Sequence, residues 1–272
     1  MEKVLSINQL RQEIAEVRSL QRGFITNFFF DSNKHSLWIE KGDLMLEHVN
    51  NTLFIIKIAH TFVNVFYCST TLDEFSKDLS EFIANYPNRT MMFDIVGHHA
   101  QCQPVVNMFK SKGCSVAASL VRMSRIAEPF DYTVDVSVRK ASELDIQDIS
   151  QLLHNYFDAQ TEQIPYDEEL LNYALQGHIL LCEEEGRIIG FLIYEQNAST
   201  LYLRYWFTHP DFRNRKVGSR LLRRYFEEGR NTKRQIFWVI RTNENAIKRY
   251  KHYGFKEEDM YDYVLTNINR GG

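Results

Sequence analysis

The sequence lacks long hydrophobic runs. No stretch of its 272 residues approaches the roughly 18 apolar residues that a membrane span needs. The N-terminus, MEKVLSINQLRQEIAEVRSL, is charged and amphipathic, and it contains no uninterrupted apolar core of the signal-peptide type. These absences predict a soluble, cytoplasmic protein without a membrane partner.

Cysteine is scarce, and its spacing excludes the common metal and redox motifs. The sequence contains no Cys-x-x-Cys pair and no cysteine with histidines at zinc spacing. The four cysteines are Cys68, Cys102, Cys114 and Cys182. We therefore predict no metal site and expect buried or half-buried free thiols in a reducing compartment.

An excess of positive charge is missing as well. The net charge is -3 at pH 7 and the pI is near 6.3, whereas a general nucleic-acid binder is usually more basic. Hydrophobic residues make up 44% of the chain and aromatic residues 13%, which excludes a disordered chain and is typical of a globular protein. The length suffices for one large domain or two small ones. Nucleic acid is therefore not an expected partner.

Apolar spacing and turn residues predict alternating helices and strands in the first half of the chain. Leu72, Phe75, Leu79 and Phe82 share one face of a helix that a threonine opens. The expected elements are a helix within residues 1–30, strands over 36–49 and 52–68, a helix over 70–86, a strand over 89–97, a helix over 103–113 and a strand over 115–126.

Residues 127–133, AEPFDYT, are the best linker candidate, because Pro129 interrupts both the helical and the strand pattern. We therefore predict an N-terminal domain at 1–128 and a second domain at 133–272. The expected elements of the second domain are a strand over 134–141, a helix over 142–157 capped by Ser142, a helix over 167–177, a hairpin over 178–197 that turns at Glu185–Gly186, a strand over 199–210, a helix over 217–230, a strand over 234–241, a helix over 244–254 and a strand pair over 255–265.

Basic residues gather where the strand over 199–210 leads into the helix over 217–230. The cluster consists of Arg213, Arg215, Lys216, Arg220, Arg223 and Arg224. The first N–H groups of a helix have no partner and the macrodipole adds positive charge, so this end is suited to anions. Gly218 permits close approach of a ligand to the backbone. The stretch predicts a phosphate or pyrophosphate site, although it is not a Walker P-loop; a solvated helix face is the alternative.

Two motifs in this half resemble the GNAT superfamily of N-acetyltransferases. THPDFRNRKVGSRLL is similar to the family's coenzyme A loop, Arg/Gln-x-x-Gly-x-Gly/Ala, which falls on Arg213, Lys216 and Gly218. Lys216 departs from the pattern because it replaces the first glycine. NENAIKRYKHYGF matches the family's Asn-x-x-Ala-x-x-x-Tyr-x-x-x-Gly-Phe segment at every marked position, including Asn243 and Tyr250. The resemblance covers about residues 134–265 and implies a mixed central sheet flanked by helices.

The resemblance implies acyl transfer from acetyl-CoA, the co-substrate, to an amine. It also implies that the residues that would bind the cofactor are Tyr205, Trp206, Phe207, Thr208, Arg213, Asn214, Arg215, Lys216, Val217, Gly218, Ser219, Asn243 and Ala246. Tyr250 would protonate the leaving thiolate, since an unperturbed phenol is protonated at pH 7; an ordinary core-edge aromatic is the alternative. Glu195 is the carboxylate we name as a candidate general base, and we expect His209 to be structural.

The N-terminal half echoes the later part of the same fold in degenerate form. The segment at the place of the cofactor loop, YCSTTLDEF, has no glycine and no arginine, and Asp73 and Glu74 would repel a pyrophosphate. We therefore interpret this half as a smaller α/β domain, a pseudo-acetyltransferase that shapes the acceptor cleft. An unrelated small α/β domain is the alternative.

The sequence thus predicts an α/β protein whose second domain is an acetyl-CoA-dependent N-acyltransferase acting by direct attack of a primary amine in a ternary complex. One rival is a longer acyl-CoA or an acyl carrier protein as donor, since exposed arginines at 220–224 would suit an acidic carrier. Another is a non-catalytic CoA-binding or interaction module, which Lys216 favours. The acidic segment 158–169 favours a cationic acceptor amine. A homodimer is left open.

Overall fold

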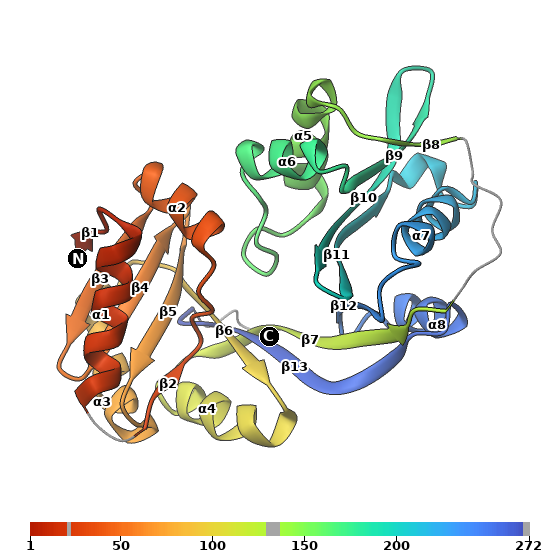
Figure 1. Ribbon diagram of the computed structural model, residues 1–272. Coiled ribbons are helices and arrows are strands. Elements are labelled where there is room, and N and C mark those ends of the chain that lie inside the picture. Colours follow the sequence, from red (N-terminus) through yellow and green to blue (C-terminus); the bar gives the residue numbers. More distant parts are fainter. Residues whose placement is uncertain (21–22, 129–136, 269–272) are drawn as a thin grey trace. The chain divides into compact units, whose positions relative to one another are not determined.

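The computed structural model of the chain describes residues 1–20, 23–128 and 137–268, and it divides into two compact units (Figure 1). Unit 1 comprises Met1–Leu120 and the C-terminal residues from Asp259 onward. Unit 2 comprises Val121–Glu258. The predicted linker at 127–133, with Pro129, lies largely outside the described residues.

Unit 1 is a mixed sheet with helices. Its elements are β1 (Glu2–Lys3), α1 (Ile7–Leu20), β2 (Ile25–Thr26), α2 (Ser32–Glu40), β3 (Leu44–Val49), β4 (Thr52–Ile58), β5 (Val63–Ser69), α3 (Leu72–Asn85), β6 (Met91–Gly97), α4 (His99–Ser111) and the first part of β7 (Ser115–Ile126). The strands follow the order β1-β3-β4-β5-β6-β13, where β13 is Lys256–Thr266, and β2 pairs with β5. The pairs β3–β4 and β4–β5 are antiparallel, whereas β5 and β6 run parallel.

The core of unit 1 is built by the helix face that the sequence predicts. Phe75, Leu79 and Phe82 of α3 are fully buried, and Leu72 packs against the same cluster. The rings of Phe82 and Phe54 stack with their centroids 4.0 Å apart. The Thr71 side chain accepts a hydrogen bond from the Glu74 N–H, so the predicted threonine cap of this helix is confirmed.

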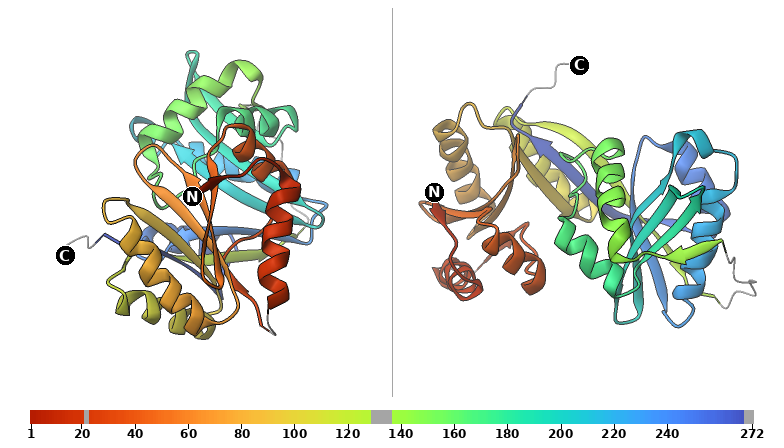
Figure 2. Two further views of the ribbon diagram at one scale, coloured as in Figure 1. Left: turned by 90° about the vertical axis from the view of Figure 1, so that its left-hand side faces the viewer. Right: turned by 90° about the horizontal axis from the view of Figure 1, so that it is seen from above.

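Unit 2 repeats this design. Its elements are β8 (Val138–Lys140), a short 3-10 turn (Glu143–Asp145), α5 (Ile146–Tyr156), α6 (Asp167–Leu175), β9 (Ile179–Glu184), β10 (Arg187–Asn197), β11 (Thr200–Thr208), a 3-10 turn (Pro210–Phe212), α7 (Val217–Glu228), β12 (Arg234–Ile240) and α8 (Glu244–His252). The strand order is β8-β9-β10-β11-β12-β7. Figures 1 and 2 show α5 and α6 on one face of this sheet and α7 on the other.

The two units share one order of elements and exchange their last strands. In each, two helices precede three antiparallel strands, a helix, a parallel strand, a second helix and a final strand. From Asp259 onward β13 belongs to unit 1 and pairs with β6, from Tyr261 opposite Gly97 to Thr266 opposite Met92. From Val121 onward β7 belongs to unit 2. The units therefore do not coincide with the predicted domains 1–128 and 133–272.

Three predicted elements differ from the structure in type or in number of strands. Residues 36–40, predicted as part of a strand, end the helix α2, because the Asp31 carboxylate accepts from the Lys34 N–H at 2.9 Å and starts a helix upstream. The predicted strand over 52–68 is the hairpin β4–β5. The predicted strand pair over 255–265 is the single strand β13.

The cysteines match the sequence prediction. Cys68, Cys102, Cys114 and Cys182 are buried and form no disulfide bond. Burial raises the pKa of Cys68 and of Cys114 to about 11, so both remain protonated thiols at neutral pH. Across the described residues, no helix has the length and apolar character that crossing a membrane requires.

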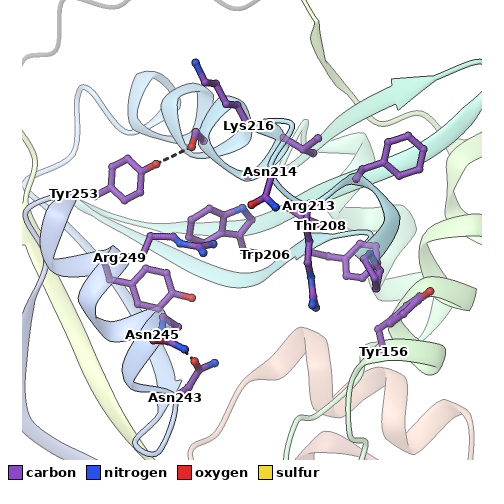
Figure 3. Close-up of a pocket in the computed structure, with 18 of the residues that line it drawn as sticks. Tyr156, Trp206, Thr208, Arg213, Asn214, Lys216, Asn243, Asn245, Arg249 and Tyr253 are labelled. Carbon is purple, nitrogen blue, oxygen red and sulfur yellow. Dashed lines mark hydrogen bonds between the residues drawn. The ribbon is translucent and has the colours of Figure 1, made fainter.

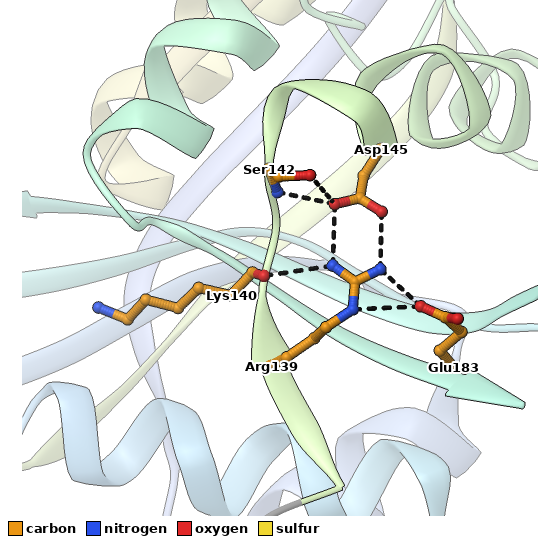
Figure 4. A network of polar contacts seen from close by, with 5 residues as sticks. All are labelled: Arg139, Lys140, Ser142, Asp145 and Glu183. Carbon is orange, nitrogen blue, oxygen red and sulfur yellow. Dashed lines mark hydrogen bonds and ion pairs between the residues drawn. The ribbon is translucent and has the colours of Figure 1, made fainter. Parts of the chain in front are cut away.

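An ion-pair network fixes the start of α5 in unit 2 (Figure 4). The Arg139 guanidinium donates to both oxygens of Asp145, at 2.7 and 2.8 Å, and to Glu183. The same carboxylate accepts from the Ser142 N–H at 2.7 Å, which confirms Ser142 as the residue that opens this helical segment. The hydrogen bond from Arg139 is the largest cause that lowers the pKa of Asp145 to about 2.

We predict that Asp145→Asn destabilises the protein by about 1–2 kcal/mol at pH 7, a value reduced for the exposure of Arg139. Because the folded-state pKa is lowered, this stabilisation is present above about pH 4 and is lost as the pH falls toward 2. Urea unfolding at pH 7 and pH 3 tests this, with the exposed Asp148 of the following helix α5, changed to Asn, as the control. Equal loss in both variants would contradict the prediction.

Candidate active site

The site begins where two parallel strands separate. Within the described part of the chain, β11 and β12 pair only from Thr200 with Arg234 to Tyr202 with Ile236, although both strands continue further. A bulge lies just beyond this point, since Tyr194 pairs with Leu203 but Ile193 pairs with Tyr205. A bulge bends its strand and increases the twist. The edge of β11 that faces β12 beyond Tyr202 therefore offers unpaired backbone groups to a ligand.

A cavity of ≈ 830 Å³ lies at this separation (Figure 3). It is lined by the end of β11, the loop after it, the first turn of α7 and one face of α8. The predicted cofactor residues that line it are Trp206, Phe207, Thr208, Arg213, Asn214, Lys216, Val217, Gly218, Ser219, Asn243 and Ala246, together with Tyr250. Tyr205, Arg215 and Glu195 are not among its lining residues.

The α7 end of the cavity is arranged for an anion. Among the described side chains none caps this helix, and its first turn contains no acidic residue. The N–H groups of the first turn thus face the cavity without an intrahelical acceptor. Arg213 and Lys216, both exposed, leave the loop in opposite directions (Figure 3).

Lys216 keeps the backbone conformation that a glycine would favour. It precedes α7 in the left-handed region, with φ 60° and ψ 14°, and Asn214 has φ 68°. A non-glycine residue in this region costs about 1–2 kcal/mol. The sequence left open whether Lys216 disrupts the loop, and the structure shows that the chain takes the turn despite the side chain.

Gly218 lets the strand end pack directly under the helix. A Cβ atom at this position would lie 3.2 Å from both Thr208 Oγ1 and Trp206 Cζ2. The Trp206 indole nitrogen is buried and lacks a hydrogen-bond partner among the described residues. The sequence predicts that Gly218 lets a ligand approach the backbone closely. In the structure, Thr208 and Trp206 of the protein itself make this close approach.

The loop between β11 and α7 is held by the β9–β10 hairpin. The Arg187 guanidinium donates to His209 Nε2 at 2.7 Å, and the Tyr156 hydroxyl lies 3.2 Å from the same atom. Arg215 pairs with Glu184 at 3.0 Å. His209 is buried, as expected of a structural residue. Arg215 is thus drawn toward the hairpin and does not line the cavity.

The predicted residues of α8 meet at the other wall of the cavity. Asn243 caps the helix, because its Oδ1 accepts from the Ala246 N–H at 3.2 Å. The Tyr250 ring lies between Phe237 and Trp206, with centroid distances of 4.5 and 5.6 Å. Burial raises the pKa of Tyr250 to about 12. The phenol is therefore protonated at neutral pH.

Sequence reasoning missed Arg249 of α8 and Tyr253, the residue that follows this helix, which also line the cavity. Tyr253 and Ser219 share a hydrogen bond of 2.9 Å that ties α8 to the first turn of α7. Arg249 and Tyr253 follow Ala246 by three and seven residues. Helical spacing from the recognised alanine could therefore have found both.

Tyr205 of β11 and Glu195 of the neighbouring strand β10 lie on the sheet face that carries α5 and α6. Tyr205 is buried in the cluster beneath these helices, and its hydroxyl donates to the Gln163 carbonyl. Glu195 accepts from the Tyr173 hydroxyl at 2.5 Å and lies 3.5 Å from Arg204 Nε. Because the bulge at Arg204 shifts the alternation, Tyr205 faces α5 and α6 while Trp206 faces α7.

The acidic segment 158–169 is largely used for local structure. Asp158 accepts from the Gln160 N–H at 3.0 Å, and Glu169 accepts from the Tyr166 N–H at 2.9 Å. Asp167 accepts from Gln147. Burial raises the pKa of Glu162. These contacts weaken the argument from composition for a cationic acceptor.

Comparison with known proteins identifies unit 2. Residues 146–255 match the acetyltransferase (GNAT) family, and this range spans the elements that build the cavity. The C-terminal part of the chain contains a GNAT domain. This confirms the family that both sequence motifs indicated.

One relative is similar in sequence, and two solved structures are similar in fold. An uncharacterized N-acetyltransferase of Methanocaldococcus jannaschii is 29% identical over 99 residues, which cover 33% of this chain and 44% of the relative. The structure of a GCN5-related N-acetyltransferase from Sphaerobacter thermophilus aligns over 91% of this chain and 96% of its own, with a TM-score of 0.58 and 13% identity. A tandem GNAT protein from the clavulanic acid biosynthesis pathway aligns over 82% of each chain, with a TM-score of 0.56 and 10% identity. These structural likenesses concern the fold.

We predict that Lys216→Gly raises the stability of the protein relative to Lys216→Ala by about 1 kcal/mol, because only glycine adopts a positive φ without strain. Urea unfolding of the two variants measures the difference, and both lack the lysine charge. Equal midpoints would show that Lys216 carries no backbone strain.

Proposed function

We propose that this protein is an acyl-CoA-dependent N-acyltransferase that transfers an acetyl group from acetyl-CoA to a primary amine. The observation that carries this proposal is the cavity between the separated strands β11 and β12, which ends at the uncapped first turn of α7. The match to the GNAT family supports it. Titration with acetyl-CoA, followed by an acyl-transfer assay against a panel of amines and peptides, tests it.

The cavity supports a division of roles along its length. Arg213, Lys216 and the N–H groups of Val217–Ser219 would hold the pyrophosphate, because they combine full charges with free backbone donors. The open edge of β11 beyond Tyr202 would hydrogen-bond the amide-rich arm of CoA. Asn243 would reach this arm with its amide nitrogen, since its oxygen caps α8.

Direct attack requires little chemistry from the protein. The amine nitrogen bonds to the thioester carbonyl carbon and gives up one proton to a general base or a water relay. The carbon–sulfur bond breaks, and the sulfur leaves with its electron pair. Tyr250, which lines the cavity and is protonated at neutral pH, would then protonate the thiolate. The buried cysteines, whose thiols stay protonated, do not support an acyl-enzyme.

The rival readings find less support. Lys216 adopts the conformation of the glycine it replaces, which weakens the case for a non-catalytic module. Of the arginines that would suit an acidic carrier protein, Arg224 pairs with Glu227 and Glu228, and Arg220 donates to Ser137. Acetyl-CoA is therefore preferred over a carrier-bound donor.

We predict that Arg213→Ala weakens CoA binding by about 1–3 kcal/mol, the scale of a charge-assisted contact. Arg215→Ala is the matched control, because Arg215 has the same charge two positions away but pairs with Glu184 outside the cavity. Its CoA affinity should stay near that of the wild type. Calorimetry measures both, and unchanged affinity in Arg213→Ala would exclude this loop as the pyrophosphate site.

We predict that Tyr250→Phe lowers kcat by about 10²–10⁴-fold while CoA affinity and stability persist, because the ring still packs against Phe237. Donors with better leaving thiols should lose less. Because the wild-type pKa is about 12, ionisation of Tyr250 should not limit the rate below pH 10. Steady-state kinetics measure this; a drop of less than about threefold would assign the proton to another group.

Glu195 is retained as the candidate that assists deprotonation of the amine. We predict that Glu195→Gln, which keeps the shape, lowers kcat by about 10²-fold or more and moves the acidic limb of the pH profile. Tyr173→Phe removes only the hydroxyl that donates to Glu195 and serves as the control. An unaltered pH profile in Glu195→Gln would leave the carboxylate with a structural role.

A further inference from the structure

Unit 1 contains the same separation of parallel strands that opens the cavity in unit 2. The strands β5 and β6 pair only from Val63 with Met91 to Asn64 with Met92 within the described residues, although β5 continues to Ser69 and β6 to Gly97. The helix α3 follows β5 as α7 follows β11. Unit 1 therefore has the strand geometry of a cofactor groove.

The chain itself occupies this separation. Asn27 is buried, with 6% of its surface exposed. Its Oδ1 accepts from the Tyr67 N–H of β5 at 2.7 Å, and its Nδ2 donates to the Asp94 carbonyl of β6 at 3.1 Å and to the Val65 carbonyl of β5 at 3.4 Å. A single carboxamide thus bridges the two strands at the point where they have parted.

The residues before Asn27 complete the filling. Ile25 and Thr26 form the strand β2, which pairs antiparallel with Ser69 and Cys68 of β5. The Thr26 hydroxyl donates to the Tyr67 carbonyl at 2.6 Å. Since β4 occupies the other edge of β5, the segment from Ile25 to Asn27 covers the edge that is open on β11 in unit 2.

We infer that unit 1 holds a groove of the acyl-CoA type that the protein fills with its own residues, with the Asn27 carboxamide in the place of a ligand amide. This inference rests on the function proposed for unit 2. An amide arm would offer the strands an acceptor oxygen and a donor N–H, and Asn27 supplies both kinds of group through Oδ1 and Nδ2. The backbone groups that line the groove are thus hydrogen-bonded within the protein, and the groove does not accept a second cofactor.

The helix end beside this groove is closed by separate means. Thr71 caps α3 with its own side chain, and the first turn carries Asp73 and Glu74. In unit 2 the corresponding turn of α7 has neither a side-chain cap nor an acidic residue, as described above. A pyrophosphate at α3 would meet two carboxylates and would compete with Thr71 for an N–H group. The prediction from YCSTTLDEF that this loop repels a pyrophosphate agrees with the capped helix.

Amide hydrogen exchange and CoA stoichiometry test the inference together. In Asn27→Ala the Tyr67 amide loses its acceptor, so its exchange should accelerate by about tenfold or more. Asn27→Asp keeps an acceptor oxygen and should keep most of the Tyr67 protection. Asn33→Ala, at an exposed position of α2, should leave it unchanged. Wild-type protein should bind one CoA per chain by calorimetry.

The outcomes separate the two proposals. Two bound CoA molecules in the wild type, or unchanged Tyr67 exchange in Asn27→Ala, would overturn the filled groove. If Asn27→Ala does not fold, the inference is tested by the CoA stoichiometry of the wild type and by Tyr67 amide exchange in Asn27→Asp. No bound CoA would instead overturn the function proposed for unit 2, while the exchange data would still report whether Asn27 bridges the strands.

Discussion

The structure depends on how parallel strands that have separated satisfy their backbone hydrogen bonds. Buried N–H and C=O groups are almost always paired, so a strand edge that leaves its neighbour must find another partner. In unit 2 the edge of β11 beyond Tyr202 faces a cavity. In unit 1 the corresponding edge of β5 is met by β2 and Asn27. The separated strand edge therefore faces a cavity in unit 2, whereas in unit 1 the protein's own residues hydrogen-bond to it.

In unit 2, contacts around the separated strands hold the end of β11 and the loop that follows it. The bulge at Arg204 turns Trp206 toward α7, and Gly218 leaves the room that its indole needs. The loop that follows is held at His209 by Arg187, which leaves Arg213 and Lys216 exposed at the helix end. The strain of Lys216 is tolerated because these contacts fix both ends of the turn. The proposed anion site thus depends on the packing behind the loop as much as on the charges in it.

Local chemistry made much of this predictable. The hairpin at Glu185–Gly186 follows from the glycine, which accepts the φ of 75° without strain. The helix starts follow from side chains that bond nearby N–H groups, Thr71 to Glu74 and Asp145 to Ser142. The cavity residues followed from two spaced motifs. What the sequence did not reveal is non-local. The bridge made by Asn27 joins residues 40 and 67 positions away, and the pairing of β13 with β6 spans more than 160. The spacing of apolar residues along the sequence does not indicate which distant residues pair.

The exchange of last strands has a consequence for how the two halves are maintained. The sheet of unit 1 contains the end of β13, and the sheet of unit 2 contains the end of β7, so neither half of the sequence includes all the strands of one unit. Glu258 of β13 accepts from Arg122 of β7 and from Arg234 of β12 within unit 2. The first half of the sequence thus supplies the end of β7 to unit 2, and the second half supplies the end of β13 to unit 1. The groove that we infer to be filled needs no ligand of its own for unit 1 to be retained, because residues 121–126 at the end of β7 belong to unit 2.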